Sequence, residues 1–295
     1  MTLQNCIERM KIMKKTKKLL CVFLSLVMML TLSVPAFAGE EEATKFVVLG
    51  DSIAQGYGLK DIRNTAYGAL ISEAEGYDYV NHAIGGHTTY NLNQRLEEEQ
   101  VASDVASADI IAVSIGGNNF LLGGMVEMIA DVLLKGDYTR MDEIGADFRE
   151  NFLVALERIK QLNPDATLMI QTLYNPRDDF LKEPYQYAVN ILNNTFAEIL
   201  REQPAAYVIV DVAAAFEGHT EYIQRDKIHP NEAGHYVIAQ EYVKTLAELG
   251  LGTAEELTTP MPETQQGSNA LQELLNKIAE FFRNIIEKVR SIFGA

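Results

Sequence analysis

The chain has 295 residues, of which 47% are hydrophobic and 22% are charged, so it can bury a sizeable core. Its formal net charge is −16 at pH 7, and so acidic a surface repels nucleic acid, which excludes DNA and RNA as expected partners. Both cysteines, Cys6 and Cys21, lie near the N-terminus, so the rest of the chain offers no thiol for a disulfide, a zinc site or a nucleophile.

The first 38 residues have the composition of a secretory signal peptide. A basic stretch ends at Lys18, an apolar run follows, and Ala36-Phe37-Ala38 fits a small-x-small cleavage site. We therefore predict a signal peptide over 1–38, an acidic tail over 39–44 and an exported protein, either free or associated with the cell envelope. An uncleaved anchor helix is the alternative for the same segment.

Strand and helix signals alternate from residue 45 onward. Short runs rich in β-branched residues predict buried parallel strands, and the segments between them have a helical period. The predicted strands are 46–49, 79–82, 110–114, 167–171 and 207–211. The predicted helices are 66–75, 88–101, a long helical region within 120–161, 185–202 and 231–248. This alternation predicts a three-layer α/β domain over 45–250 with a mainly parallel, five-stranded sheet.

The residues after 250 divide into a linker and an amphipathic segment. Residues 251–269 are rich in proline, glycine and polar residues, which is typical of a linker. In the predicted helical tail, 270–295, the apolar positions fall within an arc of about 140° that basic side chains flank. Through residues 270–293 this helix could bind a membrane surface, self-associate or pack on its own domain. Its distributed charges exclude a membrane-spanning helix.

Four short motifs carry the candidate chemistry. Gly50-Asp51-Ser52 follows the first predicted strand, and Asp226-Lys227-Ile228-His229-Pro230 precedes the last predicted helix. Gly85-Gly86 and Asn118-Asn119 follow two other strands. A serine hydroxyl becomes a nucleophile when a histidine takes its proton, and a carboxylate must orient that histidine. The pattern predicts a hydrolase with Ser52 as nucleophile, His229 as base and Asp226 as its orienting carboxylate.

In these motifs the chain resembles the SGNH/GDSL hydrolase family. Four blocks, in the order expected for the family, carry the resemblance: 50–58, 81–89, 115–119 and 226–231. The resemblance implies a flavodoxin-like α/β/α fold and acyl-enzyme chemistry that needs no cofactor and no metal. It also implies an oxyanion hole formed by Ser52, Gly86 and Asn118, with Gly85 as the alternative to Gly86. Asn119 departs from the family, where aspartate usually stands, and we expect it to adjust loop hydrogen bonds.

The expected substrate is a small-molecule, lipid or glycan acyl ester, and the resemblance favours an esterase or lipase. Carbohydrate O-acetyl esterase and acyltransferase stay open as alternatives, as does a non-catalytic envelope-binding module that acts through the C-terminal helix. His87, Asn119 and Tyr174 are candidate substrate contacts, and the apolar residues within 120–146 are a candidate lid. Asp51 is expected to bond loop amides rather than to react, and no metal-ligand spacing stands out.

Overall fold

The computed structural model describes residues 43–254, 256, 257 and 259–262, together with Met13 and Lys15. The predicted signal peptide, apart from those two residues, and the amphipathic segment 270–293 lie outside the described residues. The chain divides into two units, Met1–Glu42 and Ala43–Ala295, and the fold belongs to the second. Within the described part, no helix is both long enough and apolar enough to cross a membrane.

Five parallel strands form one sheet in the order β2-β1-β3-β4-β5. Each lies within one residue of its prediction at either end: β1 (Lys45–Gly50), β2 (Asp78–Asn81), β3 (Ile110–Ser114), β4 (Thr167–Gln171) and β5 (Val208–Val210). The inner strands β1, β3 and β4 are buried almost throughout, as their continuous apolar runs predict. The strand order reverses between β1 and β3, which is where open α/β sheets bind ligands.

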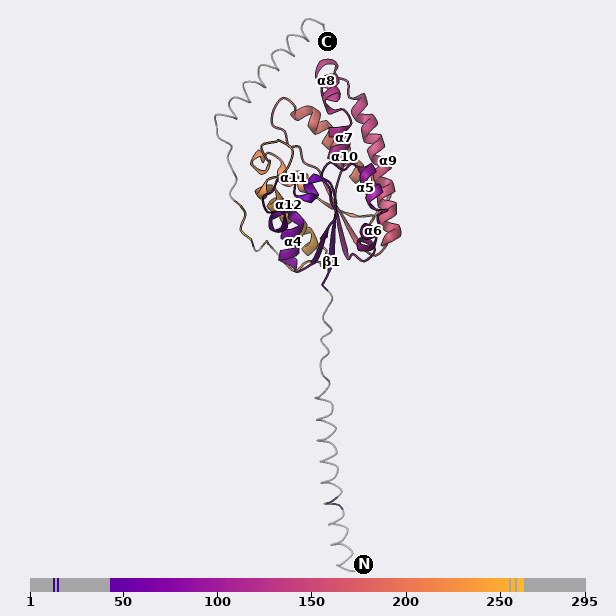
Figure 1. Cartoon of the computed structure of the whole chain (residues 1–295), viewed down its shortest axis with the longest axis vertical. Coiled ribbons are helices and arrows are strands. Elements are labelled where there is room, and N and C mark those ends of the chain that lie inside the picture. The colour runs from indigo at the N-terminus through magenta and orange to yellow at the C-terminus, as the bar shows by residue number, and fades with distance from the viewer. Residues whose placement is uncertain (1–12, 14, 16–42, 255, 258, 263–295) are drawn as a thin grey trace, which may run out of the picture. The chain divides into compact units, whose positions relative to one another are not determined.

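Helices cover both faces of the sheet and complete the predicted three-layer α/β fold (Figure 1). On one face lie α4 (Tyr67–Glu75), α11 (Val212–Phe216) and α12 (Glu232–Glu248). On the other face lie α5 (Thr89–Arg95), α6 (Glu99–Ala106), α9 (Thr139–Leu162) and α10 (Lys182–Glu202). Two further helices, α7 (Gly117–Leu122) and α8 (Met125–Lys135), follow β3 beyond the carboxyl end of the sheet. The short elements are α2 (Ser52–Gln55), α3 (Ile62–Thr65) and a 3₁₀ turn (Thr220–Tyr222).

The side-chain alternation of the strands divides the core between the two faces. Val47 of β1 packs into the core that contains Phe148, whose ring meets Phe196 edge-on at 5.7 Å. Val48 points the opposite way, into the core that contains Tyr67. Full burial of one such side chain contributes about 1.5–3 kcal/mol, so the two cores hold the sheet rigid beneath the site.

The predicted helical region within 120–161 is divided by glycines. Gly124 and Gly136 have left-handed φ angles of 94° and 67°, and they separate α7, α8 and α9. Such φ angles interrupt a helix, and glycine adopts them at no steric cost. The predicted helix over 88–101 is also two helices, α5 and α6, although no glycine lies between them. The helices α2, α3 and α11 are too short to produce a helical period in the sequence.

The compact domain extends past residue 250 into the predicted linker. The Tyr77 hydroxyl donates to the carbonyl of Leu251 at 2.8 Å, and the Thr253 N–H donates to the Glu75 carboxylate at 2.7 Å. Leu257 is buried in the core beside α12. Polar composition predicts a linker here because it does not reveal that Glu75 of α4 supplies the acceptor for this segment.

Candidate active site

A tight turn at the end of β1 presents Ser52. Gly50 has a φ of 135°, and a Cβ atom at this position would lie 2.0 Å from the Ser114 carbonyl oxygen, so only glycine fits. The Asp51 side chain accepts a hydrogen bond from the Ile53 N–H at 3.0 Å and caps α2. This confirms the structural role predicted for Asp51. The turn therefore places the Ser52 hydroxyl at the β1 to β3 switch point.

The Asp51 carboxyl group is buried directly beneath this turn. Burial raises its pKa from 3.8 to about 7, although the hydrogen bond from Ile53 lowers it. His235 is also fully buried, and its Nδ1 accepts from the Tyr67 N–H at 3.3 Å. Burial lowers the His235 pKa to about 3, so this histidine is a neutral packing residue. Asp51 therefore supports the Ser52 turn, whereas His235 supports the start of α4.

Two hydrogen bonds join Ser52, His229 and Asp226 into one constellation. His229 Nε2 lies 2.8 Å from Ser52 Oγ, across 177 positions of sequence, and His229 Nδ1 lies 2.6 Å from Asp226 Oδ2. Asp226 Oδ1 also accepts the N–H groups of Ile228 and His229 at 3.0 and 3.1 Å. Burial raises the Asp226 pKa, but these hydrogen bonds outweigh it and hold the pKa below its ordinary value. Asp226 therefore faces the imidazole as a carboxylate.

The loop that carries His229 is supported by residues from other segments. The Tyr174 hydroxyl donates to the Ile228 carbonyl at 2.8 Å, and its ring stacks on Phe216 at 4.3 Å. The Tyr57 ring lies 4.6 Å from the His229 ring. The Gln224 N–H donates to the His229 carbonyl at 2.7 Å. No sequence pattern distinguishes Tyr57 or Gln224, whose one signal is nearness in sequence to Ser52 or His229.

The three predicted oxyanion donors, Ser52, Gly86 and Asn118, differ in whether the protein already supplies them with acceptors. Among the described residues, the N–H groups of Ser52 and Gly86 donate to no protein acceptor. The Gly85 N–H is engaged by Gln55 Oε1 at 3.0 Å, which favours Gly86 over the alternative Gly85. Asn118 Nδ2 donates one hydrogen to the His87 carbonyl at 3.0 Å. An amide nitrogen carries two hydrogens, so a second remains for an oxyanion.

Of two predicted substrate contacts, Asn119 and His87, the first has side-chain hydrogen-bond partners of its own. Asn119 Oδ1 accepts the Thr89 N–H at 3.2 Å, and Asn119 Nδ2 donates to Thr89 Oγ1 at 2.9 Å. This confirms the predicted role of Asn119 in loop hydrogen bonding. His87 is partly exposed, and burial together with Arg95 lowers its pKa, although Glu98 raises it. Direct contact of either residue with substrate stays a prediction.

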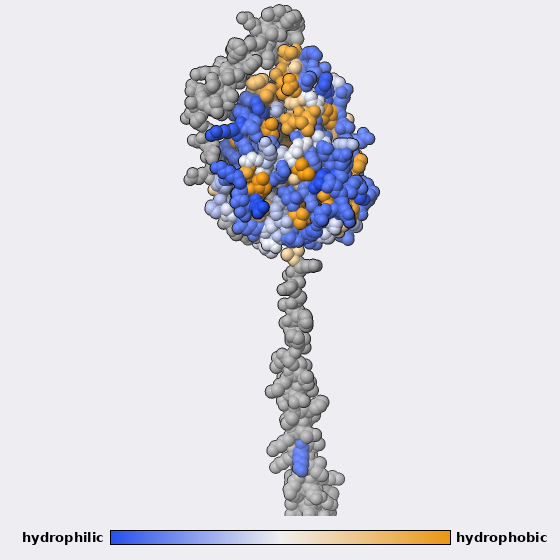
Figure 2. Space-filling model, in the orientation of Figure 1, coloured by the Kyte–Doolittle hydropathy of each residue, from blue (hydrophilic) through white to orange (hydrophobic). Residues whose placement is uncertain are grey.

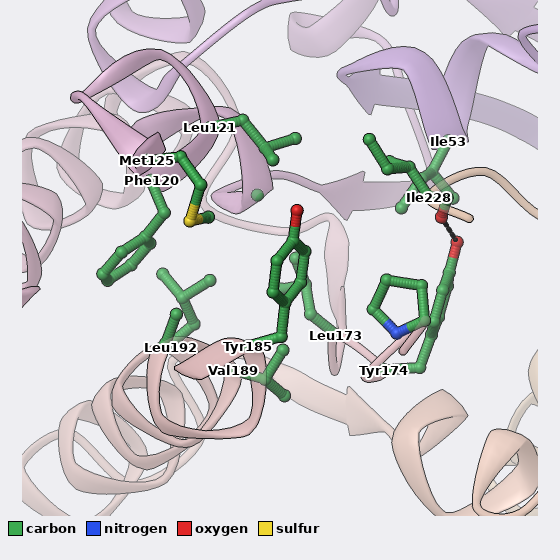
Figure 3. Close-up of a pocket in the computed structure, with 13 residues that line it drawn as sticks. Ile53, Phe120, Leu121, Met125, Leu173, Tyr174, Tyr185, Val189, Leu192 and Ile228 are labelled. Atoms are coloured by element: carbon green, nitrogen blue, oxygen red, sulfur yellow. Dashed lines mark hydrogen bonds between the residues drawn. The ribbon is translucent and has the colours of Figure 1, made fainter. Parts of the chain in front are cut away.

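An apolar pocket lies beside the Ser52 turn. It begins at Ile53 and Ile228, the immediate neighbours of Ser52 and His229, and Tyr174 forms part of its wall. The Tyr185 hydroxyl points into it (Figure 3). Its other lining residues come from α7, α8, α10 and the loop after β4: Gly117, Phe120, Leu121, Met125, Leu173, Pro176, Ala188, Val189 and Leu192. A largely apolar concave pocket next to a few polar groups is typical of a ligand site.

The described residues contain no group of three or more His, Cys, Asp or Glu side chains arranged to hold a metal ion.

Comparison with known proteins identifies the class. Residues 48–237 match the GDSL-like lipase/acylhydrolase family, and the chain belongs to that family. The fold is also similar to the lipase Lip_vut3 from a goat rumen metagenome, with a TM-score of 0.58 and 21% identity over 71% of this chain and 98% of that one. Phospholipase A1 from Streptomyces albidoflavus gives a TM-score of 0.53 and 20% identity over 70% and 99%.

A relative in Bacillus subtilis extends the comparison at the level of sequence. The uncharacterized protein YpmR is 22% identical over 222 residues, which is 72% of this chain and 84% of the relative. The structural similarities confirm the flavodoxin-like α/β fold, and the family supports ester hydrolysis as the class of activity.

Proposed function

We propose that this chain is a serine esterase or lipase that cleaves acyl esters through a covalent acyl-enzyme. Ser52 is the nucleophile, His229 is the general base and then the general acid, and Asp226 orients His229. The observation that carries the proposal is the pair of hydrogen bonds, 2.8 and 2.6 Å, that link the three side chains.

In the first half-reaction, the Ser52 oxygen attacks the ester carbonyl carbon while His229 Nε2 accepts the hydroxyl proton. The carbonyl oxygen becomes an oxyanion that receives hydrogen bonds from the N–H groups of Ser52 and Gly86 and from Asn118 Nδ2. Asp226 stabilises the imidazolium. The carbon–oxygen bond of the leaving alcohol then breaks, the alcohol takes its proton from His229, and the acyl group stays on Ser52.

In the second half-reaction, water takes the place of the alcohol. His229 removes a proton from that water as its oxygen attacks the acyl carbon, and the same donors hold the oxyanion. The bond to Ser52 breaks, Ser52 regains its proton from His229, and the carboxylic acid leaves. Each step uses only residues of this chain and water.

The apolar pocket supports an acyl group of several carbons as the substrate portion bound beside Ser52. Its walls are aliphatic and aromatic side chains. Each CH₂ group of an acyl chain that leaves water to bind against them contributes about 0.8 kcal/mol to the free energy of binding. An acetyl group would leave most of this surface unused. The pocket therefore favours a lipid-like ester over an acetylated glycan.

We also propose that the protein is exported and that residues 1–38 are removed. The basic, apolar and small-residue segments of the N-terminal sequence support this. N-terminal sequencing of the protein secreted by a producing cell should begin at Gly39. Recovery of the chain inside the cell with residues 1–38 attached would contradict the proposal.

A fluorophosphonate probe tests the nucleophile directly. The wild-type protein should form a covalent adduct that mass spectrometry maps to Ser52, and Ser52→Ala should not label. His229→Ala should label far more slowly, because the hydroxyl loses its base. Ser107→Ala alters a surface hydroxyl far from the pocket and should label like wild type. Equal labelling of wild type and Ser52→Ala would overturn the proposal.

A further inference from the structure

The outer sides of α7 and α8 carry an apolar surface next to the pocket. Leu122 and Val126 are 68% and 78% exposed, and Leu134 is 45% exposed. Figure 2 shows hydrophobic residues gathered at the end of the domain where α8 lies in Figure 1. Leu121 and Met125, which immediately precede Leu122 and Val126, line the pocket. The exposed surface is therefore continuous with the pocket wall.

The charged residues of α8 lie on a separate strip of the helix. Val126, Ala130 and Leu134 follow one another at intervals of four residues, and all three are exposed. Glu127, Asp131 and Lys135 form the neighbouring strip, where Lys135 Nζ lies 2.7 Å from Asp131 Oδ1. Met128 and Val132 face the core. A helix packed on a domain usually has a polar outer side, whereas half of this one is apolar.

We propose that Leu122, Val126, Ala130 and Leu134, the α8 docking surface, bind a lipid surface with zwitterionic or uncharged headgroups. Continuity with the pocket favours lipid over a protein partner, because a lipid aggregate both covers the apolar surface and supplies an acyl chain at Leu121 and Met125. The net charge of −16 disfavours anionic headgroups. Entry of the acyl chain into the pocket rests on the proposed function, whereas docking does not.

Docking is measured without turnover by using the full chain with Ser52→Ala. Flotation with phosphatidylcholine vesicles should recover this protein with the lipid. Adding Leu122→Asp and Val126→Asp should lower the partition coefficient by at least about tenfold, since two exposed apolar side chains no longer enter the lipid. Val154→Asp, on α9 and 54% exposed, is the matched control and should bind like the parent.

Three outcomes would overturn this proposal. They are absence of binding to phosphatidylcholine vesicles, unchanged binding after Leu122→Asp and Val126→Asp, and equal loss of binding with Val154→Asp. A companion variant, Phe282→Asp with Ile285→Asp, alters the apolar arc of the C-terminal segment. Loss of binding only in that companion would assign docking to the tail instead. With Ser52 restored, the variant that carries Leu122→Asp and Val126→Asp should hydrolyse a soluble acetyl ester at the wild-type rate. This control distinguishes a failure of the proposed catalytic function from a failure of lipid docking.

An independent observation concerns the loop between Asp226 and His229. Lys227 has a left-handed φ of 57°, which residues with a side chain rarely adopt. Its Nζ lies 3.2 Å from Asp178 Oδ1 and 3.6 Å from Asp179 Oδ2. Asp179 also accepts from Arg177, whose guanidinium lies 5.5 Å above the Tyr185 ring on the pocket wall. These contacts join the histidine loop to the pocket wall.

We propose that Lys227 is a positioning residue that holds His229 against Ser52 through Asp178 and Asp179. The proposal rests on the proposed function, because the held atom is His229 Nε2. Strained backbone at a reactive loop persists only when surrounding contacts impose it, and this ion pair is such a contact. Because Lys227 lies between Asp226 and His229, loss of the ion pair frees both residues at once.

The test compares the kcat of three Lys227 variants for hydrolysis of a soluble ester. Lys227→Met should lower kcat about tenfold through misplacement of His229, and Lys227→Arg should stay within about twofold of wild type. Lys227→Gly relaxes the backbone but should not restore kcat. Added salt should lower the wild-type kcat toward that of Lys227→Met, because it screens the pair. Lys244→Met, which breaks the surface pair with Glu241, is the control. A wild-type kcat in Lys227→Met or Lys227→Gly would overturn this role, whereas Ser52-independent turnover would overturn the proposed function itself.

Discussion

The two halves of the candidate site are built in different ways. The polar half consists of Ser52, at the start of α2, and of Asp226 and His229, on the loop before α12. Backbone N–H groups donate to the carboxylates of Asp51 and Asp226 in these segments. The apolar half consists of side chains from α7, α8, α10 and neighbouring loops, several of which also belong to the core. The difference indicates that reactivity and acyl-chain selectivity can be altered separately, because few residues serve both.

Ser52→Ala should have the largest effect, since it removes the centre of the polar half. Ester hydrolysis should fall by roughly 10⁴-fold or more, and equally for short and long acyl chains, because the nucleophile is common to all substrates. Steady-state kcat/KM on two esters measures this. Circular dichroism should show an unchanged fold. A loss confined to one chain length would contradict the division between the halves.

Asp226→Asn should reduce kcat by roughly 10³-fold while preserving the loop. The asparagine oxygen can still accept the N–H groups of Ile228 and His229, but the side chain no longer supplies the negative charge that stabilises protonated His229. The loss should again be equal for short and long chains. A kcat within tenfold of wild type would contradict the role proposed for Asp226.

Leu121→Trp should act on the apolar half alone. The larger side chain occupies the pocket from a half-buried position, where it can be accommodated without overpacking the core. The kcat/KM for a long-chain ester should fall about 10- to 100-fold, and the value for the acetyl ester should stay near wild type. Equal losses on both esters, with an unchanged melting temperature, would mean that the two halves are not separable.

Asp51→Asn should have the smallest effect on activity and a distinct effect on stability. Because burial raises the Asp51 pKa to about 7, the stability that protonated Asp51 contributes is full below about pH 4 and is lost as the pH rises through 7. One pKa unit corresponds to about 1.4 kcal/mol, so the change amounts to a few kcal/mol. Asparagine keeps the acceptor for the Ile53 N–H and does not ionise.

Urea unfolding of wild type and Asp51→Asn from pH 4 to pH 8 checks this prediction. The free energy of unfolding of Asp51→Asn should rise relative to that of wild type across this range. A difference that stays constant with pH would show that Asp51 does not titrate in the folded protein.

The sequence predicts the polar half of the site better than the apolar half. The strands can be predicted because parallel strands buried on both faces need continuous apolar runs, and the reactive groups follow them as short motifs at strand ends. The pocket cannot be predicted in the same way. Leu173 and Val189 have the same pattern as core residues, and only their tertiary placement makes them a pocket wall.

Other features were beyond sequence patterns for specific physical reasons. The division of the region within 120–161 depends on the left-handed φ angles of Gly124 and Gly136. A glycine can adopt such an angle but need not, so its presence in the sequence does not by itself predict the end of a helix. The packing of Thr253 and Ala254 depends on the Glu75 carboxylate, which is distant in sequence. Long-range pairing of this kind leaves no periodic signal in a single sequence.

The most direct test of the account is hydrolysis of a p-nitrophenyl ester series from acetate to palmitate, by the mature protein and by Ser52→Ala in parallel. The proposed mechanism predicts activity that depends entirely on Ser52, and the apolar pocket predicts a kcat/KM that rises from acetate toward longer acyl chains. Hydrolysis that persists in Ser52→Ala would contradict the proposed nucleophile. Ser52-dependent activity that is highest on acetate would contradict the role assigned to the pocket.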